Sequence, residues 1–174
     1  MLTEKDKTLI LDLVSERIDK DTFYANASID LNENSIKQLL EDTYNSKDGK
    51  MLMYLILVLY ILELDILYYD TYLPIVKKMI EEDWHQEHEQ LVEYLTEKVD
   101  VENTFIFCKI LHTVYDYYKG EEEDFMVPIW NKCIWALGKI GTPKAVECIK
   151  EFRNSPYEWV RKTVERQYEI YHWE

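Results

Sequence analysis

Two short motifs in this sequence have the spacing of metal ligands. Glu82 precedes His85 by three residues, and Glu169 precedes His172 by three residues. Di-iron helix bundles use this Glu-x-x-His spacing, because residues three apart lie on the same side of a helix. Such a site also needs inward carboxylates from neighbouring helices, so the motifs alone predict only a candidate metal site.

His88 extends the first motif, because Glu81, His85 and His88 would share one face of a helix. The only acids next to the most apolar predicted helix are Glu63 and Asp65. His88 also falls on an apolar stripe, where a hydrogen-bonded core histidine is the simpler interpretation. We therefore predict no metal and no cofactor, and a metal-dependent enzyme ranks last of three functional hypotheses.

Nucleophilic catalysis has one candidate pair. Cys108 and His112 are one helical turn apart, but the helix predicted around them is apolar on nearly all sides. A thiol in such surroundings is disfavoured as thiolate and is inert. No serine lies in a nucleophile-elbow pattern, and no glycine-rich phosphate loop is present. The sequence therefore predicts a protein without enzyme activity.

The formal net charge of −14 is unevenly distributed. Residues 63–124 carry 17 acidic and 5 basic side chains, whereas residues 125–174 carry 6 acidic and 8 basic ones. A negative field of this kind repels nucleic acid and anionic lipid and attracts cationic partners. We expect a protein partner, and neither nucleic acid nor a membrane; the sequence does not indicate the oligomeric state.

Acidic and aromatic residues alternate in this middle segment. Glu89, Glu93 and Glu97 are spaced four apart, so like charges would follow one another along one helix face. A solvated face that keeps the protein soluble is the competing interpretation. The interleaved tyrosine and tryptophan favour an interface for a basic partner. The predicted partner-binding residues are Glu81, Glu82, Asp83, Trp84, Glu89, Glu93, Tyr94, Glu97, Tyr117, Tyr118, Glu121, Glu122, Glu123 and Asp124.

The three cysteines, Cys108, Cys133 and Cys148, lie within predicted helices and form no CxxC motif. Three free and mostly buried thiols predict a reducing, cytoplasmic location. The first residues carry charges inside their apolar run and do not resemble a signal peptide. The twelve apolar residues from Met51 to Leu62 are too few to span a bilayer and predict a fully buried core helix.

Periodicity and capping signals predict about nine helices and no strands. Thr3 with Asp6 resembles a cap pair, Asn32 or Asn34 caps the second helix, and Gly141 ends the seventh. Residues 23–31 are predicted as a link, and residues 68–72 as a connector before a helix that has Pro74 in its first turn. The predicted helices cover roughly residues 3–20, 32–44, 51–65, 73–82, 85–98, 102–118, 126–140, 142–152 and 155–171.

The seventh and ninth helices begin about 30 residues apart on one template, which indicates a helical repeat array. The segment ALGKIGTPKAVECIKEF, from Ala136 to Phe152, resembles the helix–turn–helix of HEAT-like repeats of the phycobilisome-lyase type. In SPYEWVRK, which follows, Val160 and Arg161 are similar to the start of that family's next helix. The family's arginine usually pairs with an acid in the preceding turn, where this chain has Asn154.

This resemblance covers residues 126–171 best and implies a single domain over residues 1–174. The implied fold is an all-α solenoid, a right-handed superhelix of HEAT-like antiparallel helix pairs. Short, acidic HEAT-like proteins of bacteria include immunity proteins that neutralise toxins. The resemblance therefore implies an immunity protein that binds a cationic toxin, such as a nuclease, through the acidic and aromatic residues. The alternative is an adaptor or scaffold with another protein partner.

Overall fold

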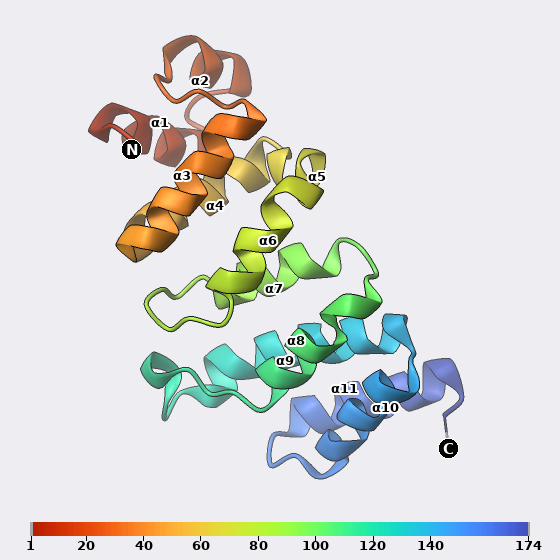
Figure 1. Cartoon of the computed structure of the whole chain (residues 1–174). Coiled ribbons are helices and arrows are strands. Elements are labelled where there is room, and N and C mark those ends of the chain that lie inside the picture. Colours follow the sequence, from red (N-terminus) through yellow and green to blue (C-terminus); the bar gives the residue numbers. More distant parts are fainter. Residues whose placement is uncertain (1, 174) are drawn as a thin grey trace. The chain divides into compact units, whose positions relative to one another are not determined.

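The computed structural model describes residues 2–173, and within that range the chain is all-α. It has eleven α-helices where nine are predicted, because α2 and α5 are additional, and the prediction of an all-helical chain is confirmed (Figure 1). The chain divides into two compact units, Met1–Gln90 and Leu91–Glu174. Among the described helices, none is long and apolar enough to cross a membrane. The helices are α1 (Glu4–Val14), α2 (Lys20–Asn26), α3 (Glu33–Ser46), α4 (Gly49–Ile61), α5 (Leu64–Leu67), α6 (Tyr69–Met79), α7 (His88–Thr96), α8 (Thr104–Leu111), α9 (Glu122–Ile140), α10 (Pro143–Lys150) and α11 (Glu158–Tyr171), with 3-10 turns at Val101–Asn103, Asp116–Tyr118 and Glu151–Asn154.

The first helix begins with the predicted cap. The Asp6 amide donates to the Thr3 hydroxyl at 3.1 Å, and the Thr3 amide donates to the Asp6 carboxylate at 3.0 Å, which is a complete capping box. Asp6 also accepts the Ser28 amide at 2.7 Å, so it ties α1 to the segment after α2. Burial alone would raise the pKa of Asp6, but hydrogen bonds from Thr3 and Ser28 outweigh it and lower the pKa to about 2.

The prediction is wrong between residues 15 and 31. Helix α1 ends at Val14 instead of Lys20, since Glu16 adopts a left-handed backbone with φ of 55°. A separate helix, α2, then begins at a cap in which the Asp19 carboxylate accepts the Thr22 amide at 2.8 Å. Its Phe23 is fully buried, so part of the predicted link belongs to the core of the first unit.

The apolar stretch is a core helix, although it is not buried on all sides. Helix α4 buries Leu52, Leu55 and Val58 completely, whereas Tyr60 is largely exposed. The helix ends at Ile61 and the left-handed Glu63 turns the chain into α5.

Helices α3 and α6 pack side by side and run parallel (Figure 1). Thr71 donates to Glu33 near their beginnings, and Tyr44 donates to Glu82 near their ends at 3.1 Å; each pair is separated by 38 residues. The Asn32 side chain caps α3, which decides between the two predicted caps. The predicted connector at residues 68–72 is wrong, because α6 begins at Tyr69 and Pro74 lies inside it.

In the second unit, α8 packs on α10 and α9 packs on α11. Helices α9 and α11 are parallel: the ring of Trp130, in the middle of α9, is 5.4 Å from that of Tyr157, which caps the start of α11, and Gly138 meets Gln167 nearer their ends. A β-carbon on Gly138 would collide with the side chain of Gln167, which would have to move to make room for it.

The turns on either side of α10 follow the predicted chemistry in part. Gly141 is left-handed with φ of 64°, and Thr142 caps α10 with Pro143 in its first turn, as predicted. Helix α11 begins at Glu158, slightly after the predicted start. Val160 is fully buried, and the Arg161 guanidinium donates to the carbonyl oxygens of residues 155 and 156 at 2.6 and 2.8 Å. The arginine therefore holds the turn through backbone oxygens, without an acidic partner there.

Candidate functional site

The start of α9 brings acidic and aromatic side chains together within the second unit. Glu121, Glu123 and Asp124 are exposed, and Glu122 is half-buried. The Gly120 amide donates to the Glu122 carboxylate at 3.0 Å, which lowers the pKa of Glu122. Three of these acids occupy the first helical turn, where negative charge also offsets the helix dipole.

Stacked aromatic rings lie next to these acids. The ring of Tyr117 meets the edge of Tyr118 with centroids 4.5 Å apart, and Tyr118 stacks on Phe125 at 5.0 Å. Phe125 is 43% exposed, whereas Tyr118 is 9% exposed. Phe125 is thus the outermost ring of the stack, and the predicted Tyr118 supports it from inside.

Helix α7 and its end carry further predicted residues. Glu93 is exposed and pairs with Lys132 of α9, with Nζ and Oε2 2.6 Å apart. Glu97 is exposed, but α7 ends at Thr96, so the expected run of acids on one helix stops before it. Tyr94 is buried. The charged part of this prediction therefore lies on the surface, while Tyr94 packs inward.

The remaining predicted residues belong to the first unit. Glu81 and Asp83 are exposed, and Glu89 is half-buried. Glu82 accepts the Tyr44 hydroxyl and lies 3.4 Å from the Lys47 ammonium. The half-buried ring of Trp84 meets the edges of Tyr44 and His85, at centroid distances of 6.4 and 4.7 Å. The structure thus places Glu81–Glu89 in one unit and Glu93–Asp124 in the other.

The candidate metal histidines are buried and hydrogen-bonded. Residues 81–87 are not helical, so the predicted helix face of Glu81, His85 and His88 does not form. The His85 ring accepts the Glu87 amide at Nδ1, and its Nε2 lies 2.9 Å from the carbonyl oxygen of Met79, which assigns the Nε2–H tautomer. His85 and His88 stack with centroids 4.3 Å apart.

Burial sets the charge of both rings. It lowers the pKa of His85, and burial together with the neighbouring His85 lowers the pKa of His88 to about 3. The Nε2 of His88 lies 2.7 Å from the carbonyl oxygen of Glu82. Within residues 2–173, no group of three or more histidine, cysteine or acidic side chains could hold a metal ion. Both rings are core histidines that order the segment before α7.

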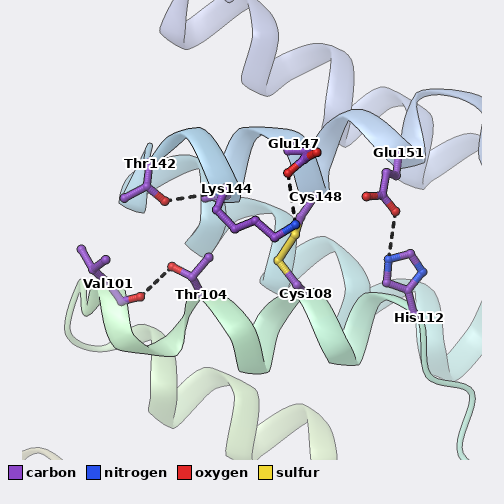
Figure 2. Close-up of a disulfide and its surroundings, with 10 residues drawn as sticks. Val101, Thr104, Cys108, His112, Thr142, Lys144, Glu147, Cys148 and Glu151 are labelled. Carbon is purple, nitrogen blue, oxygen red and sulfur yellow. Dashed lines mark hydrogen bonds and ion pairs between the residues drawn. A yellow bond between two sulfur atoms is a disulfide. The ribbon is translucent and has the colours of Figure 1, made fainter.

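The prediction of three free thiols is wrong, because Cys108 and Cys148 form a disulfide between α8 and α10 (Figure 2). Their Cα atoms are 5.8 Å apart, which is ordinary disulfide geometry. One turn further along, His112 pairs with Glu151 at 3.2 Å, in the 3-10 turn that follows α10. Cys108 and His112 therefore bond to separate partners and not to each other. The third thiol, Cys133, is free and buried as predicted, and burial raises its pKa.

Sequence reasoning missed Phe125 and the disulfide. Phe125 precedes Met126, which begins the buried stripe of α9, and a residue next to a stripe lies about 100° around the helix from it. That offset alone does not identify Phe125 as exposed, because Val127 on the other side of Met126 is buried. The disulfide had no signal either, because three cysteines allow three different pairings.

No protein-family model, curated protein or solved structure matches this chain. The resemblance to HEAT-like repeats therefore stays a prediction that rests on its own residues.

Proposed function

We propose that the chain is a protein-binding module that recognises a cationic protein through the acidic and aromatic surface at the start of α9. The observation that carries the proposal is a half-exposed phenylalanine that directly follows four acidic residues and stacks on Tyr118. Aromatic residues supply much of the binding energy of protein interfaces, and surrounding charges steer the partner. We call this surface, Tyr117, Tyr118 and Glu121–Phe125, the α9 surface.

Within this class we propose an immunity protein that covers the substrate-binding face of a basic toxin, such as a nuclease. The acidic excess of the whole chain supports electrostatic capture of a partner whose own substrate is anionic. The HEAT-like resemblance of residues 126–171 supports a repeat scaffold. Glu81–Glu89 of the first unit are included as a second acidic contact.

The Cys108–Cys148 disulfide is relevant to the cellular compartment in which the protein functions. Disulfides persist in oxidising compartments and are rare in a reducing cytoplasm. We therefore favour an oxidising compartment over the cytoplasmic location predicted from three free thiols. The protein would then bind the toxin outside the reducing cytoplasm.

The test uses the polypeptide encoded next to this chain, purified and measured by stopped-flow association. Raising NaCl from about 20 to about 500 mM should slow association at least tenfold, since surface charges are screened. A variant with Glu121, Glu122 and Glu123 changed to Gln and Asp124 to Asn should lose most of this salt dependence. The matched control changes four exposed acids of α10 and α11, namely Glu147, Glu158, Glu165 and Glu169, to Gln.

Phe125→Ser tests the aromatic half of the surface and should raise the dissociation rate by tenfold or more. If the acidic variant associates at the wild-type rate and Phe125→Ser binds normally, the α9 surface is not the interface. Salt-independent binding that survives both changes would instead support the adaptor alternative.

A further inference from the structure

A groove lies between the parallel helices α3 and α6 of the first unit, with a volume of about 290 Å³. It is lined from α3 by Lys37, Glu41, Tyr44 and Asn45, and from α6 by Thr71, Pro74, Ile75 and Lys78. The lining residues of α3 run from Lys37 to Asn45, eight residue steps or about 12 Å along the helix. This is room for a small molecule rather than for a folded partner.

Side-chain bridges lie at both ends of the groove, one from α6 to α3 and the other from α3 to the turn that follows α6. Thr71 donates to Glu33 at one end. At the other end Tyr44 donates to Glu82, which Lys47 also approaches at 3.4 Å. A peptide lying along the groove would have to pass over both bridges, so the bounded shape favours a free small molecule.

Four polar side chains between the two bridges can still form hydrogen bonds or ion pairs with a ligand. Lys37, Glu41, Asn45 and Lys78 line the groove, and none of these side chains has a hydrogen bond or ion pair with another residue in the 2–173 range. The two hydroxyl groups nearby already donate to Glu33 and Glu82. Two ammonium groups, one carboxylate and one amide are therefore available to a ligand.

These charges select the chemistry of the ligand. The first unit carries 19 acidic and 9 basic residues, yet the groove itself has two lysines for one glutamate. The lysines attract an anionic group, while Glu41 attracts a cationic one on the same molecule. The buried Ile75 and the ring of Pro74 offer apolar contact to the carbon atoms between them.

We propose that the α3–α6 groove binds a small zwitterion, a molecule that carries a carboxylate or phosphate group close to an ammonium group. Lys37 and Lys78 hold the anionic group, Glu41 holds the ammonium group, and the Asn45 amide bonds to either. This site is independent of the α9 surface and of the function proposed for it.

The test is an NMR titration of the full ¹⁵N-labelled chain with two matched pairs of probes. The zwitterions β-alanine and phosphoethanolamine are compared with propionate and methyl phosphate, which lack the ammonium group. At least one zwitterion should shift α3 and α6 amides saturably and bind about two- to fivefold more tightly than its counterpart, the range expected for one exposed ion pair.

Variants then assign the roles. Lys37→Ala and Lys78→Ala should each weaken binding about two- to fivefold. Glu41→Gln should remove the preference for the zwitterion and strengthen binding of the plain anion. Lys50→Ala changes an exposed lysine of α4 in the same unit and should leave binding unchanged.

Circular dichroism of each variant confirms that the helices remain folded. The proposal is overturned if no probe gives saturable shifts. It is equally overturned if the members of both pairs bind with equal affinity, or if the Lys37 and Lys78 variants bind as the wild type does.

Discussion

Reduction of the Cys108–Cys148 disulfide should destabilise the second unit without affecting the first. The bond closes a segment with a sequence separation of 40 residues between α8 and α10. The chain-entropy relation for a loop of that length gives a loss of about 13 cal/mol/K from the unfolded chain, which is about 4 kcal/mol at 25 °C. We therefore expect reduction to lower the free energy of unfolding of this unit by about 2–4 kcal/mol.

Tryptophan fluorescence separates the two units in a urea titration. Trp84 is the only tryptophan of the first unit, and the other four, at positions 130, 135, 159 and 173, belong to the second. A Trp84→Phe background thus reports the second unit alone. The midpoint should fall on addition of a phosphine reductant, and hydrogen exchange of α8 and α10 amides should speed up.

Two cysteine variants complete this experiment. Cys108→Ser with Cys148→Ser should be destabilised from the start and should not respond to reductant. Cys133→Ala removes the buried free thiol, so it should be destabilised but keep its response to reductant. Under denaturing, non-reducing conditions an alkylating reagent should modify one cysteine, and after reduction three. If three are modified without reductant, or if the midpoint does not move, the reasoning fails.

Two further predictions concern the interiors of the units. Burial holds His88 neutral in the folded chain, so its favourable effect on the free energy of unfolding is complete above the unfolded pKa of 6.5 and is lost as pH falls toward 3. At pH 5 His88 should cost the first unit about 2 kcal/mol relative to pH 7, measured by urea unfolding, and His85, whose pKa burial also lowers, adds to this loss. Burial raises the pKa of Glu87, which changes stability with pH in the opposite direction, so the two pH values are compared in a Glu87→Gln background. A His88→Gln variant that keeps the full pH dependence would contradict the assignment of this effect to His88. Gly138→Ala should cost about 1–3 kcal/mol, because its β-carbon would meet the fully buried Gln167, and adding Gln167→Ala should recover part of the loss in a double-mutant cycle.

Helix ends could be predicted from the sequence where the cap is made by nearby side chains. Thr3 with Asp6, Asn32 and the Gly141–Thr142 turn all cap helices as their residue types indicate. The missed elements depend on distant partners. Helix α2 is short and is held by burial of Phe23, and a seven-residue helix has little stability of its own.

The candidate site shows the same difference between features set by nearby residues and features set by distant packing. Most of the predicted acidic residues are exposed, because charged side chains are rarely buried, although Glu82, Glu89 and Glu122 are half-buried. The positions of the aromatic residues are harder to predict, since tyrosine and phenylalanine suit both core and interface. Tyr94 and Tyr118 pack inward and Phe125 faces outward, and that difference depends on which face of each helix meets its neighbour. The pairing of Cys108 with Cys148 likewise depends on the packing of α8 against α10.

Under the proposed function, the acids at the start of α9 act on both helix stability and binding, and separate measurements of the two can distinguish these effects. As first-turn residues they favour the helix whether or not a partner exists, because they oppose the helix dipole. This local effect accounts for acidic residues at the helix start, but it does not account for a half-exposed Phe125 on a tyrosine stack. The proposed binding at this surface therefore rests on the aromatic residue more than on the charge beside it.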